Sequence, residues 1–340
     1  MFYLAGDLGG TKTLLAVYSV KERVQNIYQK RYVSKDWKSF AEILNNFLEN
    51  LPSNIESPKR GCVCIAGPVK QGKSKITNLG WNLDKKKLID QTSLQELDLI
   101  NDFSVLIYGL YHFSSEQYVE VQNRLKPLEI DEVVTIIGAG TGLGIARGIN
   151  TKSGLIALPS EGGHREFSPR CNKEVNLYEW IKKDLNLSRV SLERIVSGTG
   201  LGQIARWRLQ KEDAHTHPLN LKDIANNFSI KSLKDPNLPS VVSKLAEEGD
   251  PLMIEVLKMW LSAYGSAVGD LALHELSTGG IWIAGGTAAK QIKGIQSKIF
   301  ISSMTNKGRF EQFMKELPVI ALTDPQAGLF SSACRALMLK

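Results

Sequence analysis

The stretch that decides the fold is FYLAGDLGGTKTLLAVYSV, residues 2–20. Residues 2–5 and 14–20 are rich in apolar, aromatic and β-branched side chains, which favour strands, and three glycines lie between them. Since glycine adopts the backbone conformations that tight turns need, the pattern predicts a strand, a turn and a second strand. The hairpin would carry polar residues around its turn: Asp7, Thr11, Lys12 and Thr13.

The same arrangement returns further along the chain. VVTIIGAGTGLGIARGI, residues 133–149, contains an apolar strand, a glycine turn with Thr141, and a second apolar strand. GGIWIAGGTAAK, residues 279–290, contains a short strand and a glycine turn that leads into a helix. The similarity of the first two copies indicates two related lobes. Three such turns can present backbone N–H groups and small hydroxyls to one polyphosphate.

Strands and helices alternate through the rest of the chain, which indicates the α/β class. Short β-prone runs predict further strands near residues 26–33, 61–69, 97–100 and 317–323. Apolar residues at helical spacing predict helices near 39–50, 103–113, 176–185, 200–209, 250–276 and 327–339, and a helical turn is expected at 93–97. A chain of 340 residues is long enough for two lobes.

The composition is that of a soluble globular protein. Apolar residues make up 43% and charged residues 23%, and no apolar run approaches the roughly 20 residues that would span a bilayer. Asp7 interrupts the first apolar segment before a signal-peptide core could form, and the four cysteines make no CxxC pair, so we expect a cytoplasmic protein without a zinc site. The net charge of +7 is scattered along the chain, which suits a phosphate ligand better than a nucleic acid.

Two motif matches do not carry the function that they suggest. GPVKQGKS, residues 67–74, fits the P-loop pattern, but KITNLGW follows it and is poor helix material, so we expect a hairpin tip with solvated lysines. A strand after Ser74 would exclude the P-loop, because a P-loop needs a helix there. GAGTGLG, residues 138–144, contains GxGxxG, but IARGIN is too short and too β-branched for the helix of a dinucleotide site.

Polar residues suited to a ligand site follow predicted strands. In LDLINDFSVL, residues 97–106, Asn101 and Asp102 end an apolar run, and the carboxyl end of a sheet strand is where α/β proteins bind ligands. In PSEGGHREFSP, residues 159–169, Glu161 and His164 lie in a glycine-rich loop that can approach a polar ligand, although one histidine alone can equally be structural. Glu193 lies at a predicted helix start with Ser191 as its cap, where it could also complement the helix dipole.

Together these motifs resemble the bacterial glucokinase family within the hexokinase and actin-like ATPase superfamily. The resemblance runs in the family's order from residue 4 to the C-terminal helix. The segments that carry it are GDLGGTKTLLAV from residue 6, TNLGW from 77, INDF from 100, GAGTGLG from 138, PSEGGH from 159, LERIVSG from 192, IAGG from 283 and NKGRFEQFMKELPV from 306.

The resemblance implies an α/β, two-lobed actin-like ATPase (ribonuclease H-like) fold, in which each lobe is a mixed sheet flanked by helices. Residues 1–112 plus 322–340 would form the small lobe and residues 113–321 the large lobe, with the active site in the cleft between them. A homodimer is also implied. No nucleic acid or membrane partner is expected.

The resemblance also assigns roles, with ATP and Mg²⁺ as cofactors and a hexose as substrate. Asp102 would be the catalytic base, and Mg²⁺ would arrive with ATP, with Asp7 as the residue able to hold it. The residues on the sugar hydroxyls would be Asn78, Asn101, Asp102, Glu161, His164 and Glu193. The residues facing phosphates and magnesium would be Asp7, Gly9, Gly10, Thr11, Gly140, Thr141 and Gly142, and those facing the adenosine would be Gly285 and Gly286.

The activity implied is ATP-dependent phosphorylation of D-glucose to glucose 6-phosphate, which feeds glycolysis. Two alternatives stay open: a kinase of another hexose or amino sugar, and a non-catalytic ATP and sugar sensor on the same fold. The related repressor and kinase group carries a cysteine-rich zinc motif after its EGGH-type loop. Here only Cys171 follows that loop, which leaves His164 as a sugar ligand rather than a metal ligand.

Overall fold

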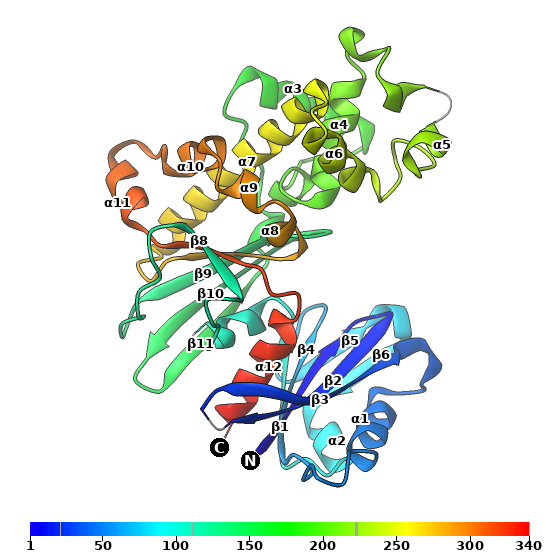
Figure 1. Ribbon diagram of the computed structural model, residues 1–340, viewed down its shortest axis with the longest axis vertical. Helices are drawn as coiled ribbons and strands as arrows, with labels where there is room; N and C mark the ends of the chain where they lie inside the picture. The colour runs from blue at the N-terminus through cyan, green and yellow to red at the C-terminus, as the bar shows by residue number, and fades with distance from the viewer. Residues whose placement is uncertain (21, 111, 222–223, 340) are drawn as a thin grey trace.

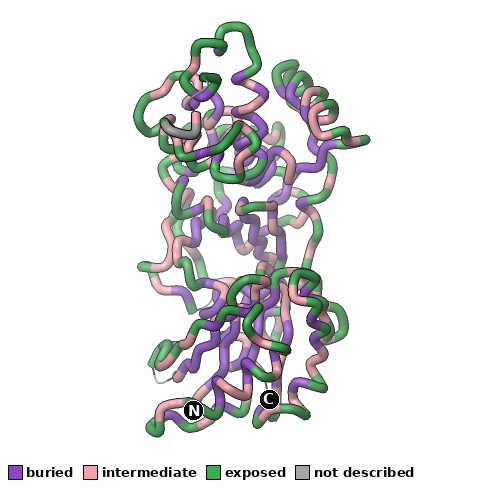
Figure 2. The backbone as a smooth tube through the Cα atoms, turned by 90° about the vertical axis from the view of Figure 1, so that its right-hand side faces the viewer, coloured by how far each residue is buried: buried purple, intermediate pink, exposed green. Residues whose placement is uncertain are grey.

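The computed structural model describes residues 1–20, 22–110, 112–221 and 224–339. Their strands form two large sheets, which lie one beyond the other along the long axis of the molecule (Figure 1). Helices flank both sheets, so the predicted α/β class is confirmed. Figure 2 shows that buried residues concentrate in the strands of both sheets and in the helices beyond the second one.

The first sheet has the order β3-β2-β1-β4-β7. The predicted hairpin is confirmed, since β1 pairs with β2 in antiparallel fashion, whereas β1, β4 and β7 are parallel. In register, Asp7 lies beside Cys64, and Ile65 lies beside Asn101. The carboxyl ends of three strands therefore meet at one edge. The strands are β1 Phe2–Leu8, β2 Lys12–Val20, β3 Val24–Val33, β4 Arg60–Ile65 and β7 Glu96–Asn101.

Two helices and a small hairpin complete this part of the chain. Helix α1, Phe40–Glu49, begins where predicted, with the Ser39 side chain accepting from the Glu42 backbone N–H. The helical turn predicted at 93–97 is wrong. The helix there is α2, Lys85–Asp90, whose capping residue Asp84 accepts from the Lys86 N–H and so starts the helix earlier. Leu94 and Leu97 are buried instead on the path into β7.

The P-loop is excluded as expected. Strand β5, Lys73–Ile76, occupies the place where its helix would begin, and it pairs with β6, Trp81–Asp84. The backbones of Lys70 and Lys73 exchange hydrogen bonds of 2.9 and 3.0 Å, which closes a hairpin tip with both lysines exposed. The short 3₁₀ helix η2, Thr77–Leu79, connects β5 to β6.

The second sheet has the order β11-β10-β9-β12-β13-β8. β9 and β10 form the second predicted hairpin, so a strand rather than a dinucleotide-binding helix follows the glycine turn. β12 lies parallel to β9 with Ala284 beside Gly138, which places the second and third glycine turns at one edge. The strands are β8 Tyr118–Gln122, β9 Val133–Ala139, β10 Leu143–Thr151, β11 Gly154–Ser160, β12 Ile281–Ala284 and β13 Val319–Leu322.

Helices cover this sheet and extend beyond it (Figure 1). The predicted long helix is α7, Pro251–Glu275, whose N-cap Asp250 accepts from the Met253 N–H. No helix in the described part of the chain is long and apolar enough to cross a membrane. The other helices are α3 Asn172–Asp184, α4 Gly198–Leu209, α5 Ile224–Phe228, α6 Leu238–Glu247, α8 Gly286–Lys290, α9 Ile292–Ile295, α10 Lys298–Thr305 and α11 Glu311–Glu316.

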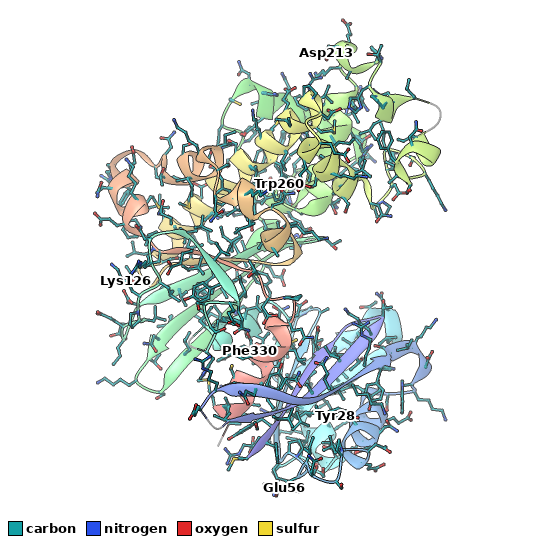
Figure 3. All side chains as sticks on the ribbon, viewed as in Figure 1. Tyr28, Glu56, Lys126, Asp213, Trp260 and Phe330 are labelled. Atoms are coloured by element: carbon teal, nitrogen blue, oxygen red, sulfur yellow. The ribbon has the colours of Figure 1, made fainter. Side chains whose placement is uncertain are left out.

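The C-terminal helix α12, Ala327–Leu337, lies between the two sheets. Phe330 stacks on Phe113 with ring centroids 5.2 Å apart, and Phe113 contacts Trp282 of the second sheet at 5.9 Å (Figure 3). Ser332 Oγ donates to the Gly6 carbonyl of β1 over 3.3 Å. One apolar cluster therefore joins both sheets through α12.

The helix predicted at 103–113 is shorter and tighter than expected. Residues Ser104–Gly109 form the buried 3₁₀ helix η3, and residue 111 lies outside the described residues. The Asn101 side chain takes the first free N–H groups, and Gly109, which leaves room for Ser331 and Phe113, is a poor helix former. Both features favour a short segment over an α-helix.

Candidate active site

Asp7 lies at the carboxyl end of β1, next to β4. The Cys64 thiol lies 3.7 Å from Asp7 Oδ1 as a hydrogen-bond donor. Partial burial raises the pKa of Asp7 above its usual range, while this hydrogen bond and the positive charge of Lys12 act in the opposite direction. A carboxylate with so little compensation is suited to meeting a cation.

Asp102 lies between the end of β7 and η3. Its backbone N–H continues the sheet by donating to the Ile65 carbonyl over 2.9 Å, and its Oδ1 accepts from Asn101 Nδ2 at 2.9 Å. Loss of hydration and then the negative charge of Asp7 raise the pKa of Asp102 to about 6. The residue stays open to solvent on one side, so a substrate can reach this carboxyl group.

Asn101 holds this corner together. Its Nδ2 also donates to the Gly67 carbonyl at 3.1 Å, and its Oδ1 accepts from the backbone N–H groups of Phe103 and Ser104. Asn101 therefore caps η3 and orients Asp102 at the same time.

The first glycine turn is closed by its own backbone and by Ser34. The Gly9 N–H donates to the Lys12 carbonyl at 3.0 Å, Ser34 Oγ donates to the Gly9 carbonyl at 3.1 Å, and the Ser34 N–H donates to the Thr11 carbonyl. A Cβ atom at Gly10 would lie 3.2 Å from Asn78 Nδ2. The turn and the exposed Asn78 are therefore direct neighbours.

The second glycine turn is braced by α4. Within the turn the Gly140 N–H donates to the Gly142 carbonyl at 2.8 Å. From α4, the Gly198 N–H donates to the Gly140 carbonyl at 2.7 Å, and Thr199 Oγ1 donates to the Thr141 carbonyl at 2.9 Å. These bonds fix the position of the turn relative to the helix.

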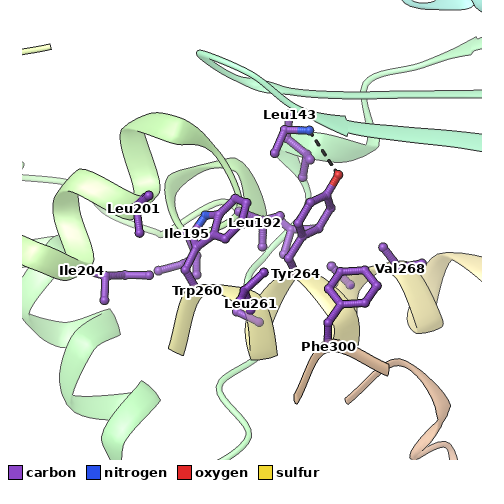
Figure 4. Close-up of a cluster of buried hydrophobic side chains, with 14 of the residues drawn as sticks. Leu143, Leu192, Ile195, Leu201, Ile204, Trp260, Leu261, Tyr264, Val268 and Phe300 are labelled. Atoms are coloured by element: carbon purple, nitrogen blue, oxygen red, sulfur yellow. Dashed lines mark hydrogen bonds between the residues drawn. The ribbon is translucent and has the colours of Figure 1, made fainter. Parts of the chain in front are cut away.

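The core beneath supports the same turn (Figure 4). Trp260 Nε1 donates to the Ser197 carbonyl at 3.0 Å, and the Tyr264 hydroxyl accepts from the Ala139 N–H at 3.3 Å. Both rings are fully buried on α7 among Leu and Ile side chains. Rigid packing thus reaches from α7 to the edge where the glycine turns lie.

The glycine-rich loop after β11 brings a further group of polar side chains together. His164 Nε2 lies 3.8 Å from Glu161 Oε2, and His164 Nδ1 lies 4.0 Å from Glu193 Oε1. Glu193 Oε2 accepts from the Leu143 N–H at 3.0 Å, next to the second turn. A Cβ atom at Gly163 would lie 2.2 Å from the Leu143 carbonyl oxygen, so this loop approaches β10 as only glycine permits.

Glu193 lies in a single 3₁₀ turn, η5, Leu192–Arg194. The cap predicted for Ser191 is wrong, because its side chain makes no capping hydrogen bond with any described backbone group. Glu193 instead points back to the glycine turn.

The third glycine turn follows β12. Gly285 has a φ of 86°, which favours glycine, and a Cβ atom there would lie 3.1 Å from the Ala139 carbonyl oxygen. Thr287 Oγ1 donates to that same carbonyl. Gly285 and Gly286 therefore lie beside the second turn, as the sequence of the two strands predicts.

The structure thus forms two groups from the sequence-predicted residues. The first lies at the edge of the first sheet and the second at the edge of the second sheet. Within the described chain, no hydrogen bond or ion pair links the Glu161–His164–Glu193 group to Asn78, Asn101 or Asp102. The first group is Asp7, Gly9, Gly10, Thr11, Asn78, Asn101 and Asp102; the second is Gly140, Thr141, Gly142, Glu161, His164, Glu193, Gly285 and Gly286.

Sequence reasoning missed several supporting residues. Thr199 and Thr287 stand beside glycines in SGTG and GGT, a signal that could have revealed them. Ser34 is far from the first turn in sequence, and Cys64 looked like an ordinary core residue, so nothing in the sequence signalled either. Among the described residues, no group of three or more His, Cys, Asp or Glu side chains is placed to hold a metal ion.

Comparison with known proteins adds to this geometry. The family model described as Glucokinase matches residues 4–338. A glucokinase of Trichormus variabilis is 35% identical over 346 residues, covering 99% of each chain. The crystal structure of a glucokinase from an Antarctic psychrotroph, 26% identical, matches with a TM-score of 0.82 over 99% of this chain and 98% of that one.

A more distant structure shares the fold. The ROK family glucokinase from Streptomyces griseus, solved in complex with glucose and AMPPNP, is 18% identical and matches over the whole of both chains with a TM-score of 0.61. The predicted actin-like ATPase fold is confirmed by these likenesses. The full-length family match and the relative at 35% identity lead to one conclusion: the chain belongs to the glucokinase family of hexose kinases.

Proposed function

We propose that this hexose kinase transfers the γ-phosphoryl group of ATP to the 6-hydroxyl of D-glucose by direct in-line displacement, with Asp102 as the general base. The observation that carries the proposal is the carboxyl group of Asp102, which is held by Asn101, has a pKa of about 6 and remains open to substrate. A base with a pKa near the working pH combines a large deprotonated fraction with real proton affinity.

Glucose would be held by polar groups from both sheets. Asn78 and Asn101 lie on the side of the base, and Glu161, His164 and Glu193 lie on the opposite side. Since the two groups make no mutual contact, we expect a hexose to bridge them. An epimer would leave one of these polar groups unpaired, and sites of this kind reject substrates that lack a hydroxyl by up to about 10⁴-fold to 10⁵-fold.

ATP would lie along the three glycine turns. Gly9, Gly10 and Thr11 would face its phosphates from the first sheet, and Gly140, Thr141 and Gly142 from the second. Gly285 and Gly286 would face the adenosine. We assign residues 1–112 plus 322–340 to a small lobe and 113–321 to a large lobe, which would close over both substrates and exclude water.

The residues present fit a magnesium ion that arrives with ATP. Asp7 and Asp102 repel one another electrostatically, and a divalent cation at Asp7 would relieve that repulsion. Bound there, the ion would neutralise charge on the phosphate oxygens. Asp7 would hold it, while Asp102 would accept the proton of the 6-hydroxyl.

Two alternatives differ in substrate or in chemistry. The same loops could serve another hexose or an amino sugar, or the protein could sense sugar and ATP without transfer. The Trichormus relative and the Antarctic structure are both named glucokinases, which favours glucose. We further expect a cytoplasmic homodimer whose product feeds glycolysis.

The proposal is tested by ADP release from MgATP with glucose, mannose, fructose, N-acetylglucosamine and N-acetylmannosamine, together with NMR identification of the product. Glucose-dependent ADP release with phosphate on O6 supports it. Preference for another sugar would move the assignment to that sugar, and ATP binding without release on any of them would favour the sensor.

A further inference from the structure

Phe103, the residue after Asp102, lies against two glycines of the other sheet. Its side chain is half-buried. A Cβ atom at Gly138 would lie 2.8 Å from a ring carbon of Phe103, and one at Gly144 would lie 2.5 Å from another. Gly138 and Gly144 are cross-strand partners on β9 and β10. They therefore form one shared opening, here called the glycine socket, that receives the ring.

Gly144 has no other evident reason to be glycine. Its backbone lies outside the left-handed region, so its conformation is open to other residues. The three nearest atoms that a Cβ would meet there all belong to the Phe103 ring, at 2.5 to 2.9 Å. At Gly138, by contrast, the Ala284 carbonyl oxygen would also interfere at 2.5 Å. The shape of Gly144 is thus matched to Phe103.

The glycine socket flanks the second glycine turn. Gly138 stands two positions before Gly140, and Gly144 stands two positions after Gly142. Because α4 braces the same turn from Gly198 and Thr199, the socket belongs to a fixed part of the molecule. The Phe103 N–H is in turn held by Asn101 Oδ1 at 3.1 Å. Phe103 therefore bridges the base and the phosphate turn across the two sheets.

We propose that Phe103 is a positioning residue whose ring, seated in the glycine socket, sets the place of the Asp102 carboxylate relative to the phosphate turn at Gly140–Gly142. The inference rests on the proposed function, since it gives Asp102 the role of base. Displacement of a reacting group by about 1 Å can cost about 10²-fold in rate. The ring prevents such displacement without itself touching a substrate.

The test compares Phe103→Ala, Gly144→Ala and the double variant in the full-length protein. We expect Phe103→Ala to lower kcat about 10-fold to 100-fold while KM for glucose and ATP changes less than about 3-fold, because positioning rather than binding is lost. Gly144→Ala should lower kcat as well, since its methyl group displaces the ring. In the double variant the methyl has room, so it should be no slower than Phe103→Ala alone.

Phe313→Ala is the matched control. Phe313 is also half-buried, but it packs on the core of the second sheet from α11, away from the glycine turns. It should lower Tm with kcat unchanged. If Phe103→Ala does not fold, Phe103→Leu takes its place, with a fall in kcat expected beyond that of Phe313→Leu at equal loss of Tm.

Two results separate this inference from the proposed function. A kcat within about 2-fold of wild type in Phe103→Ala, beside an inactive Asp102→Ala, would overturn the positioning role alone. Fully additive losses in the double variant would overturn it too, because the two side chains would then act independently. Full activity of Asp102→Ala would overturn the proposed base and this inference with it.

Discussion

The side-chain amide of Asn101 donates to Asp102 Oδ1 over 2.9 Å, while the amide oxygen accepts from the two N–H groups at the start of η3. One side chain thus fixes both the carboxylate and the backbone that follows it. This relationship explains why polar residues interrupt an apolar run there: they end a strand, cap a helix and orient an acid in one place.

Replacement of Asn101 by alanine should therefore damage both activity and stability. We expect Asn101→Ala to lower kcat/KM for glucose at least about 10-fold and to cost about 1 kcal/mol of folding free energy through the lost cap. Steady-state kinetics and urea unfolding measure the two effects. Ser39→Ala removes the cap of α1, far from the site, and should cost similar stability at unchanged kcat/KM. Equal kinetic losses in both variants would show that Asn101 acts only through stability.

The pKa of Asp102 gives a prediction for the pH dependence of the rate. A general base works only when deprotonated, so kcat/KM should be level above a pH of about 6 and fall about 10-fold per pH unit below it. The pH profile of the free enzyme with glucose at low concentration measures this. An inflection near 4, the ordinary range of an aspartic acid, would mean that burial and Asp7 do not act on the base as described.

The same shift predicts that Asp102 destabilises the folded protein at neutral pH. Because its folded-state pKa is raised above 3.8, its contribution to stability is fully present below that value and is lost as the pH rises through about 6. Asp102→Asn, which stays neutral, should therefore raise Tm above pH 7, and the gain should shrink as the pH falls toward 4. Thermal melts across this range test the sign. A gain independent of pH would exclude an electrostatic origin.

Lys73 provides a negative prediction, since the P-loop pattern would make it a phosphate ligand. In the structure it lies in the β5–β6 hairpin, with Nζ 3.2 Å from Asp84 Oδ2 on the surface. Such exposed ion pairs contribute about 1 kcal/mol or less. Lys73→Ala should leave KM for ATP within about 2-fold of wild type. A large rise in that KM would restore a phosphate role for this hairpin.

The elements that the sequence predicts well are those with local signals. Ser39 and Asp250 announce α1 and α7 through capping, and the glycines at 6–10 and 140–142 announce the hairpins. The missed helix α2 also had a local signal in Asp84, which a run of three lysines concealed. The segment at 103–113 went wrong because packing against α12 decides its form.

The site is harder to predict, because it depends on pairing between strands that are distant in the chain. The motifs indicated Asp7 and Asp102 separately, but their electrostatic coupling follows from the β1-β4-β7 order. Gly138 and Gly144 were interpreted as turn glycines, whereas the structure uses them inside strands to receive Phe103. No pattern along the chain reports a contact of that kind.

The central claim is that Asp102 is the base, and its most direct test is turnover of Asp102→Ala at saturating glucose and MgATP, with ATP affinity measured by calorimetry on the same protein. The account predicts a fall in kcat of about 10²-fold or more with ATP affinity within about 3-fold of wild type. Near-normal turnover in this variant would contradict it.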